Sequence, residues 1–307
     1  MNVEFSSFSS SPLNFRSGGA SPSGANGSSL LSRQPVALTV AGSDSGGNAG
    51  IQGDLRAFHG FGVHGCTVFA ALTAQNPDGV RAVAGVDPGF LRQQLESVFD
   101  AYAVGAIKTG MLLNVAAIET LADVLSGYPA IPKIVDPVMV ATSGTRLLDD
   151  DAVAALMSRL LPLAALITPN LPEAAVLLGR PVTGVAAAGE AARELAQRFG
   201  CAVLVKGGHD ERHRATDALC AAGVLYRVTS PVVRHPLSLH GTGCALSAAI
   251  TAALATGATM IDAVIAGKVY VYAAIRAGRV VGPSAAVLGM PRCPSMARIT
   301  IEEWCDQ

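Results

Sequence analysis

The stretch "VALTVAGSDSGGNAGIQGDL", residues 36–55, decides the fold class of this chain. Its first six residues, 36–41, are mostly apolar and predict a buried strand. Residues 42–50 are rich in glycine and serine and predict a loop, and residues 51–61 have the spacing of an amphipathic helix. A strand, a glycine-rich loop and a helix in this order are typical of the first unit of an α/β protein.

The rest of the chain repeats this alternation. Short apolar runs predict further strands, and these are 66–72, 105–109, 133–138, 165–168 and 202–207. Helical spacing lies between them, over 88–102, 114–126, 149–161, 171–178 and 187–199. Residues 217–231 predict an antiparallel hairpin at a sheet edge, and helices over 243–256 and 261–277 close the domain. The pattern therefore predicts a mostly parallel sheet with helices on both faces.

Composition divides the 307 residues into three parts. Residues 1–34 are rich in Ser, Gly, Asn and Pro and show no apolar period, so we expect a disordered N-terminal arm. Residues 35–283 form one predicted domain. The tail, 284–307, is interrupted by Pro and Gly, and its pattern assigns no role to it.

Charge and cysteine content exclude several classes of function. The net charge is −1 and only 15% of residues are charged, so the chain is not built to bind nucleic acid or an anionic membrane. Six cysteines without a CxxC pair indicate reduced thiols and a cytoplasmic location. Residues 243–260 carry no charge, but they are mainly small and are followed by Asp262, which favours two buried helices over a membrane span.

Polar and glycine residues follow one predicted strand after another. In an open parallel sheet, ligands bind beyond the carboxyl ends of the strands. We therefore expect one ligand site at this rim. The residues that follow the strands are 42–48, Gln75, Asn76, 108–111, Asp136, Asn170, Glu173 and Lys206.

The segment "HGTGC", residues 240–244, places a thiol where a glycine turn becomes a helix. Successive backbone N–H groups in such a turn can bind an anion, and the helix N-terminus adds its positive end. The same position lowers the pKa of a thiol, which makes Cys244 a candidate base or nucleophile. The alternative is a small buried cysteine in a tightly packed helix.

The glycine-rich loop 42–50 matches neither phosphate-binding fingerprint. Its spacing is not G-x-G-x-x-G, and no lysine follows as in G-x-x-x-x-G-K-[ST]. A dinucleotide site is therefore disfavoured. Asp54, one turn into the next helix, either faces a polar ligand or is a solvated acid stabilised by the helix dipole.

Three acidic or amide groups fit a cation site. Asn170 and Glu173 are three residues apart at a strand-to-helix junction, where they form a capping box, present a carboxylate to Mg²⁺ or its waters, or do both. Asp136 follows a strand and is also placed to bind a metal.

Lys206 ends an apolar strand, where it either contacts phosphate or extends from the sheet end to solvent.

Seven motifs in this order resemble the hydroxymethylpyrimidine/phosphomethylpyrimidine kinases of thiamine biosynthesis, which belong to the ribokinase-like superfamily. They are "AGSDSGGNAGIQGDL", "TAQN", "KTGML", "DPVM", "ITPNLPEA", "VKGGH" and "HGTGC", and the match covers about 36–280. The resemblance implies a three-layer α/β/α sandwich and transfer of phosphoryl groups from ATP, with Mg²⁺, to 4-amino-5-hydroxymethyl-2-methylpyrimidine and its monophosphate. It also implies a homodimer.

The resemblance assigns roles residue by residue. The implied pyrimidine contacts are Gly42, Ala49, Asp54, Gln75, Met111 and Val138. Cys244 takes the position of the catalytic base, and Gly241, Thr242 and Gly243 form the implied anion hole. Phosphate and ATP contacts fall to Lys206, Asn170 and Asp217, and the Mg²⁺ contacts to Glu173 and Asp136.

Some features depart from the family or leave alternatives open. Asn48 stands where a small residue is common, and Thr142 stands where many members carry lysine. Pyridoxal or pyridoxine kinases share the fold and its aromatic-alcohol substrates, so they are the first alternative. A non-catalytic pyrimidine-binding regulatory module on the same fold is the second.

Overall fold

The computed structural model of this chain describes residues 33–139, 147–207, 214–234, 239–282, 285–291 and 299–304. Thr142, the predicted arm up to residue 32 and residues 284, 292–298 and 305–307 of the tail lie outside these ranges. The described strands are β1 (Val36–Asp44), β2 (His64–Asn76), β3 (Gly79–Gly85), β4 (Val104–Thr109), β5 (Lys133–Val135), β6 (Leu166–Ile167), β7 (Ala202–Val205), β8 (Arg214–Ala221), β9 (Val224–Pro231), β10 (Arg279–Val280), β11 (Ala286–Val287) and β12 (Thr300–Glu303). The α-helices are α1 (Gly50–Gly60), α2 (Pro88–Ala101), α3 (Val115–Ser126), α4 (Asp150–Ala155), α5 (Leu171–Leu178), α6 (Gly184–Phe199), α7 (Thr242–Ala255) and α8 (Met260–Arg276).

One ten-stranded sheet organises the molecule, in the order β12-β9-β8-β7-β6-β5-β4-β1-β2-β3. The strands from β7 to β2 along this order pair in parallel, whereas β3 at one edge and β8, β9 and β12 at the other pair antiparallel. This confirms the predicted α/β class and the mostly parallel sheet. The predicted hairpin is also confirmed, as β8 and β9.

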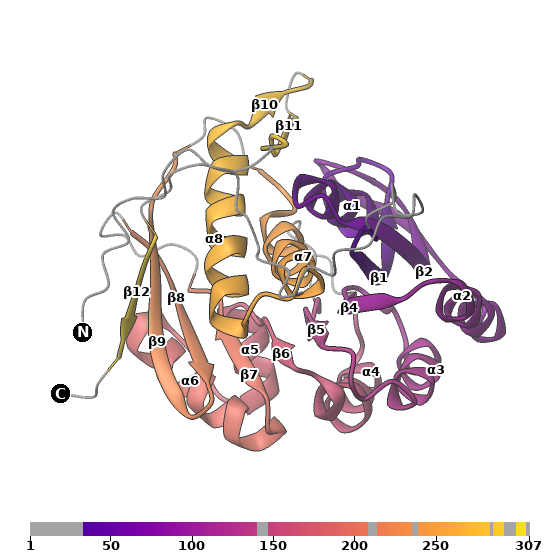
Figure 1. The fold of residues 1–307 in the computed structure, drawn as a ribbon, viewed down its shortest axis with the longest axis horizontal. Helices are drawn as coiled ribbons and strands as arrows, with labels where there is room; N and C mark the ends of the chain where they lie inside the picture. The colour runs from indigo at the N-terminus through magenta and orange to yellow at the C-terminus, as the bar shows by residue number, and fades with distance from the viewer. Residues whose placement is uncertain are drawn as a thin grey trace, which may run out of the picture.

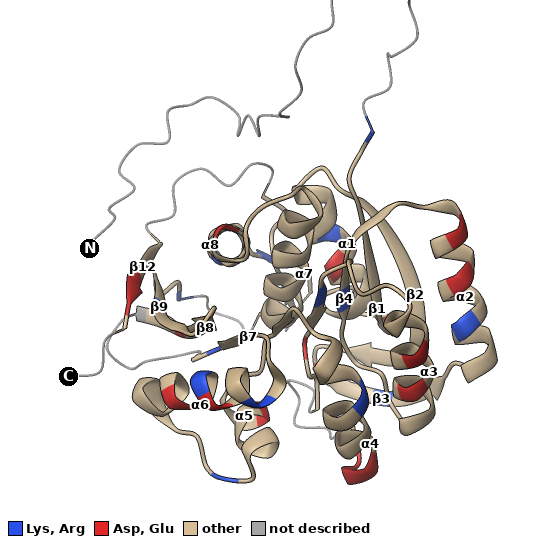
Figure 2. Ribbon diagram, turned by 60° about the horizontal axis from the view of Figure 1, so that its bottom comes forward, with Lys and Arg blue, Asp and Glu red and all other residues tan. Residues whose placement is uncertain are grey.

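Helices cover both faces of the sheet, as the view in Figure 1 shows. Alternate residues of each strand point to opposite faces, and the core is divided accordingly. Leu38 and Ile107 pack in the cluster that also holds the buried residues of α2, α3 and α6, while Ala37 packs with α1 and α7. The three-layer α/β/α sandwich therefore follows from strands that are apolar on both faces. Figure 2 marks the charged residues of α2 and α3, of which Glu96, Asp100, Glu119 and Asp123 are exposed.

Three elements differ from the prediction. Residues 79–85 form an edge strand, β3, although five of its seven residues are exposed and give no apolar signal. The predicted helix 149–161 is a short α-helix that continues as a π turn, Leu156–Leu160, and a 3₁₀ turn, Leu161–Leu163. In the tail, β12 pairs with β9, and the Trp304 ring lies 4.4 Å from the Arg227 guanidinium.

The uncharged segment 243–260 forms α7 and the start of α8, with a break between them at residues 256–259. Every residue of α7 from Ala245 to Ala253 is buried, so the apolar run belongs to the protein core. In the described ranges, no helix combines the length and apolar character that crossing a membrane requires.

Candidate active site

A cavity of about 670 Å³ opens at the carboxyl ends of the parallel strands. The structure brings together on its wall every residue to which the sequence analysis gave a catalytic, binding or metal role, with the exception of Asp54. Those residues are Gly42, Ala49, Gln75, Met111, Asp136, Val138, Asn170, Glu173, Lys206, Asp217, Gly241, Thr242, Gly243 and Cys244. They come from eight separate segments, which the parallel topology places at one rim.

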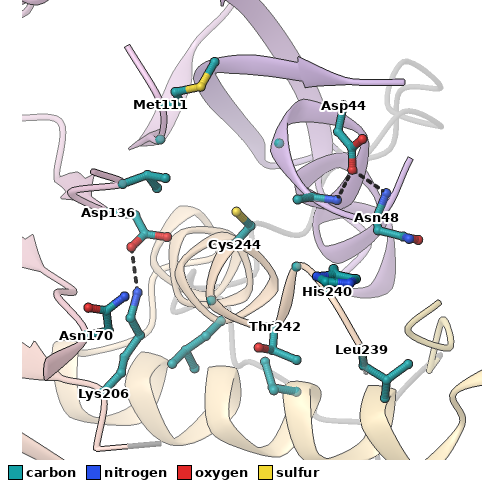
Figure 3. Close-up of a pocket in the computed structure, with 18 of the residues that line it drawn as sticks. Asp44, Asn48, Met111, Asp136, Asn170, Lys206, Leu239, His240, Thr242 and Cys244 are labelled. Atoms are coloured by element: carbon teal, nitrogen blue, oxygen red, sulfur yellow. Dashed lines mark hydrogen bonds and ion pairs between the residues drawn. The ribbon is translucent and has the colours of Figure 1, made fainter. Parts of the chain in front are cut away.

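Asp44 organises the glycine loop, residues 45–49, at one end of this cavity. One carboxylate oxygen of Asp44 accepts a hydrogen bond from Gly46 N–H (2.8 Å), and the other accepts from Asn48 N–H (2.9 Å) and Ala49 N–H (2.8 Å). Figure 3 shows this carboxylate turned toward Asn48. The three bonds fix the loop that leads into α1 and hold Ala49 against the cavity.

Gly42 and Met111 form the apolar floor of the same end. A Cβ on Gly42 would lie 2.4 Å from Met111 Cε, so a side chain at position 42 would displace the methionine. Gln75, at the end of β2, is tied to the glycine loop because Ser45 Oγ donates to its carbonyl (2.7 Å) and accepts from its N–H (2.8 Å). The Gln75 amide, the Met111 thioether and the exposed backbone of Gly42 are together suited to hold a flat polar ring.

The turn at residues 241–243 begins α7 in the way that its glycines predict. Gly241 has φ +84°, and the first intrahelical bond of the segment runs from Ala245 N–H to Gly241 O (2.9 Å). The N–H groups of Thr242, Gly243 and Cys244 precede that bond and have no partner inside the helix. A helix N-terminus of this kind attracts an anion.

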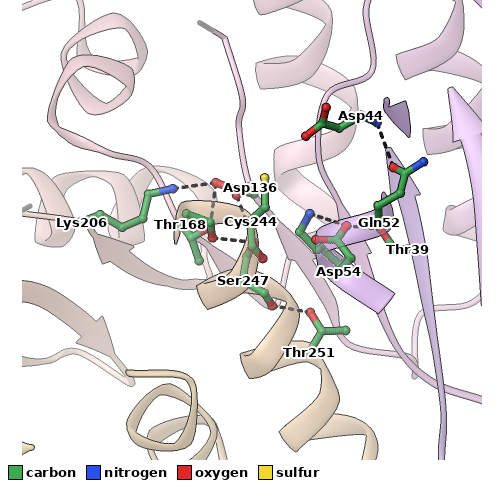
Figure 4. Close-up of polar contacts among 12 residues, drawn as sticks. Thr39, Asp44, Gln52, Asp54, Asp136, Thr168, Lys206, Cys244, Ser247 and Thr251 are labelled. Carbon is green, nitrogen blue, oxygen red and sulfur yellow. Dashed lines mark hydrogen bonds and ion pairs between the residues drawn. The ribbon is translucent and has the colours of Figure 1, made fainter. Parts of the chain in front are cut away.

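Cys244 lies between two charged clusters, one around Asp136 and one around Asp54, as Figure 4 shows. Burial raises the pKa of the Cys244 thiol, and the Lys108 ammonium acts in the opposite direction. The lowered pKa that the helix N-terminus predicts is therefore wrong for this structure. Desolvation disfavours the thiolate more strongly than the surrounding positive charge favours it.

Asp136 is the centre of the first cluster. Its Oδ1 accepts from Lys206 Nζ (2.8 Å) and Thr168 Oγ1 (3.2 Å), and its Oδ2 accepts from Ser247 Oγ (3.0 Å). Burial acts to raise the pKa of Asp136, but the ammonium groups of Lys206 and Lys108 outweigh it and the pKa lies below its usual range. Lys206 is therefore fixed by an ionised partner and does not extend into solvent.

Asn170 and Glu173 form the capping box that their spacing predicts. Asn170 Oδ1 accepts from Glu173 N–H, Glu173 Oε2 accepts from Asn170 N–H, and both distances are 2.8 Å. Burial raises the pKa of Glu173 to about 7, against the effect of Lys206 at 4.0 Å. Both residues also line the cavity, so the structural role does not exclude a functional one.

Asp54 is placed differently from both sequence expectations. It is fully buried, so it is not a solvated acid, and it does not line the cavity. Its Oδ2 accepts from Thr39 Oγ1 (2.6 Å) and Lys108 Nζ (2.8 Å), as seen for Thr39 in Figure 4. Because α1 begins at Gly50, Asp54 lies a full turn inside the helix and faces the sheet beneath the site.

The far end of the cavity is more apolar. Asp217, on β8, accepts from Gly207 N–H (3.0 Å) and pairs with the buried Lys268 of α8. The apolar residues on this wall are Val232, Val233, Leu239, Leu246, Val271 and Ile275. This end has room for a second, partly apolar ligand beside the turn at residues 241–243.

Sequence reasoning assigned no role to several residues of the site. Ser247 lies three residues after Cys244 and therefore on the same helix face, a spacing that predicts it. Lys108 is a charged residue inside the apolar strand "GAIKT", which itself signals a buried partner. Asp44 is an acid followed by a run of small residues, a pattern in which the carboxylate can accept hydrogen bonds from the backbone N–H groups that follow it. The pairing of Asp217 with Lys268 joins distant segments and has no local signal.

The sequence and the fold of this chain are similar to those of known kinases. The family model for phosphomethylpyrimidine kinase matches residues 44–288. The hydroxymethylpyrimidine/phosphomethylpyrimidine kinase of Rhizobium meliloti (strain 1021) is 48% identical over 245 residues, which are 79% of this chain and 91% of that protein. The chain belongs to the phosphomethylpyrimidine kinase family.

Other relatives and solved structures agree with this membership. The hydroxymethylpyrimidine/phosphomethylpyrimidine kinase of Escherichia coli (strain K12) is 45% identical over 70% of this chain and 81% of its own length. The phosphomethylpyrimidine kinase structure from Clostridium difficile 630 matches with a TM-score of 0.70 and 37% identity, over 79% of this chain and all of that one. A Bacillus subtilis pyridoxal kinase in an ADP complex matches with a TM-score of 0.79 and 34% identity, over 85% and 98% of the two chains.

Proposed function

We propose that this member of the phosphomethylpyrimidine kinase family transfers the γ-phosphoryl group of ATP to the hydroxymethyl oxygen of 4-amino-5-hydroxymethyl-2-methylpyrimidine, and a second phosphoryl group to the resulting monophosphate. The observation that carries the proposal is one cavity that joins the Gln75–Met111 end to the turn at residues 241–243 and to Cys244. The family relatives named for this reaction support it.

The pyrimidine lies at the end of the cavity beside Gly42, Met111 and Val138 in this proposal. The Gln75 amide both donates and accepts hydrogen bonds, as an aminopyrimidine edge requires. Ala49, held by Asp44, closes the site from the glycine loop. These contacts direct the hydroxymethyl group toward Cys244.

Cys244 serves as the general base in the proposed reaction. Its sulfur removes the hydroxyl proton as the oxygen attacks the γ-phosphorus and the bond to ADP breaks. Burial raises the pKa of the thiol and so favours its protonated form, whereas the Lys108 ammonium favours the thiolate, which is the form that can accept the proton. In-line phosphoryl transfer depends mainly on positioning and charge stabilisation. The base therefore acts together with the groups that position the alcohol and neutralise the phosphate.

The transferred phosphoryl group lies against the N–H groups of residues 242–244 in the proposed complex. Lys206 faces the same turn, since a Cβ on Gly243 would lie 3.4 Å from Lys206 Nζ. Together they neutralise charge that develops on the phosphoryl oxygens. In this proposal the Asn170 side chain, at the start of α5, contacts the phosphates of ATP. Asp217 acts at the nucleotide end, where it holds Lys268 on the cavity wall.

Glu173 and Asp136 are the residues that would hold Mg²⁺. Carboxylate oxygens are the ligands this ion prefers, and Mg²⁺ is commonly held by one or two carboxylates together with water and substrate phosphates. The described residues contain no group of three or more His, Cys, Asp or Glu side chains arranged around a metal, so in this proposal water and the phosphates of the nucleotide would complete the coordination. Bound there, the ion would neutralise phosphate charge.

The proposal extends to a homodimer in the cytoplasm. Among the described strands β3 is at the edge of the sheet, and exposed apolar side chains stand on β3 (Val83), on its partner β2 (Leu72) and on α2 (Phe90). A second copy that covers this edge would bury them. The proposed cytoplasmic location rests on the six scattered cysteines of the sequence, which form no CxxC pair.

Pyridoxal kinase activity is the second candidate. Solved pyridoxal kinases match with TM-scores of 0.79 to 0.81, and one of them is 34% identical to this chain. Both substrates are flat rings with a hydroxymethyl group, which the same cavity end can hold. The match to the family of pyrimidine kinases over residues 44–288 favours the first proposal.

The test is a product assay with purified protein, ATP and Mg²⁺. Hydroxymethylpyrimidine, its monophosphate and pyridoxal are supplied separately, and products are resolved by anion-exchange chromatography and mass spectrometry. We expect monophosphate and diphosphate from the pyrimidines, with kcat/KM at least ~10-fold above that for pyridoxal. A preference for pyridoxal would favour the second candidate. Pyrimidine binding by calorimetry without any product would indicate a non-catalytic module.

A further inference from the structure

A buried ion pair lies beneath the candidate site and has no part in the proposed steps. Lys108, on β4, and Asp54, on α1, are both fully buried and are 2.8 Å apart between Nζ and Oδ2. The desolvation of two charges largely offsets their attraction, so a buried pair of this kind is weak support for stability. Stability alone therefore does not explain why this ion pair is buried beneath the site.

Lys108 reaches from this pair to the cavity wall. Its ammonium lies 3.2 Å from the place of a Cβ on Gly110, and both residues line the cavity. Because position 110 carries no side chain, nothing at that residue separates the ammonium from the cavity. A charge fixed there acts on groups in the cavity through a medium of low dielectric constant.

Cys244 is one of the groups on which this charge acts. The Lys108 ammonium acts to lower the pKa of the Cys244 thiol, and so does the backbone N–H of Gly50, at the start of the helix that carries Asp54. The other charged groups near the thiol are Asp54, whose carboxylate disfavours the thiolate, and Asp136 and Lys206, which pair with each other at 2.8 Å. Glu173 lies beyond them, 4.0 Å from Lys206.

We propose that the Lys108–Asp54 pair is a positioning element for Cys244, in which the Lys108 ammonium stabilises the thiolate and Asp54 holds the ammonium in place. This inference rests on the proposed role of Cys244 as base and deepens it. Asp54 fixes Lys108 through one oxygen and is itself fixed by Thr39, which donates to that oxygen at 2.6 Å. Asp54 thereby influences the reaction without touching the pyrimidine.

The test measures the thiolate directly and needs neither ATP nor pyrimidine. The sulfur of the Cys244 thiolate displaces iodide from iodoacetamide, and the proton has already been lost to solvent. The rate is followed against pH for the Cys244 peptide by mass spectrometry, which separates it from the other cysteines. The midpoint of this curve reports the thiol equilibrium of the folded protein.

Three variants separate charge from structure. Lys108→Met removes the ammonium but leaves the Asp54 carboxylate buried without a partner, which can prevent folding. The double variant Lys108→Met/Asp54→Asn removes both charges at similar volume. It keeps the test valid if the single variant does not fold. Thr39→Val is the matched control, because it removes a hydrogen bond of the same cluster and no charge. Circular dichroism checks the fold of each variant.

We expect the midpoint to rise by about 1 unit or more in Lys108→Met, to rise in the double variant, and to stay at the wild-type value in Thr39→Val. Alkylation at a fixed pH below the midpoint then slows about tenfold in Lys108→Met. An unchanged or lower midpoint in the double variant overturns the proposal, as does an equal shift in Thr39→Val or a double variant that does not fold. If instead pyrimidine is not phosphorylated while the midpoints shift as expected, the proposed function fails and the positioning role stands.

Discussion

The carbonyl oxygen of Asn48 lies where a side chain on Gly241 would begin. A Cβ on Gly241 would stand 2.1 Å from Asn48 O and 3.2 Å from Ala49 Cα. The glycine loop beside the proposed pyrimidine site and the turn that would receive the phosphoryl group thus touch backbone to backbone. This contact requires glycine at position 241, and in the proposed complex it would set the separation between alcohol and phosphate.

The first prediction concerns this contact. Gly241→Ala should lower kcat/KM by about 10²-fold or more, because the new methyl group forces the two loops apart and misplaces the reacting groups. Gly257→Ala is the matched control. Gly257 follows the other end of α7 with φ +90° and has open space around its Cβ position, so the substitution should cost only about 1–2 kcal/mol of stability. Steady-state kinetics and thermal unfolding separate the two, and equal kinetic losses would contradict the account.

The second prediction concerns Asp44. Asp44→Asn leaves one acceptor oxygen for three N–H donors, so the glycine loop should loosen and the KM for the pyrimidine should rise. The free energy of unfolding should fall by about 1–3 kcal/mol. Asp87→Asn, at the N-cap of α2, is the control and should leave KM unchanged and stability nearly so, since asparagine caps a helix about as well as aspartate and Asp87 accepts from Phe90 N–H away from the cavity. An unchanged KM in Asp44→Asn would show that the loop does not shape the site.

The third prediction separates binding from chemistry at Gln75. Gln75→Ala should weaken pyrimidine binding about 5- to 30-fold, the cost of losing one or two hydrogen bonds, with a smaller effect on the phosphoryl-transfer step. Gln94→Ala is the control, because Gln94 bonds the backbone of Phe69 on the same strand, β2, outside the cavity. Isothermal titration calorimetry gives Kd for both. A loss of rate at unchanged Kd would assign Gln75 a different role.

The fourth prediction is a pH dependence of stability. The pKa of Glu173 in the folded chain, about 7, lies above its ordinary value of 4.5, so the folded state binds this proton more tightly. That contribution to stability is complete below about pH 4.5 and is lost as pH rises through about 7. Glu173→Gln retains the capping box, which glutamine also forms, and removes this loss. Relative to the variant, the wild-type protein should lose about 1–3 kcal/mol between pH 4.5 and 7.5 in urea unfolding. Parallel pH curves for the two proteins would contradict the raised pKa.

Much of the fold could be predicted because its signals are local. The strand, loop and helix over 36–61 follow from apolar runs, glycines and helical spacing, and the parallel sheet follows from repeating that unit. The edge strand β3 could not be predicted, since its exposed side chains carry no apolar pattern and its pairing with β2 is tertiary. The same holds for β12, whose pairing with β9 spans about 70 residues of chain.

The site was predictable wherever a residue follows a strand. Asp136, Asn170 and Lys206 were placed at the rim by topology alone, and the structure gathers them there. Asp54 shows the limit of this reasoning. Position along a helix does not decide which way a side chain faces, and only the packing of α1 on the sheet reveals its partner, Lys108. The pKa of Cys244 was misjudged for a related reason, since burial cannot be read from its place at a helix N-terminus.

The most direct test of the central claim is the single-turnover rate of phosphoryl transfer in Cys244→Ala, measured by rapid quench at saturating ATP, Mg²⁺ and hydroxymethylpyrimidine. Cys201→Ala, a partly exposed thiol outside the cavity, is the control. We predict a rate about 10²-fold or more below wild type in Cys244→Ala, with the Kd for pyrimidine within about threefold. A wild-type rate in Cys244→Ala, or a loss that lies entirely in Kd, would contradict the assignment of the thiol as the base.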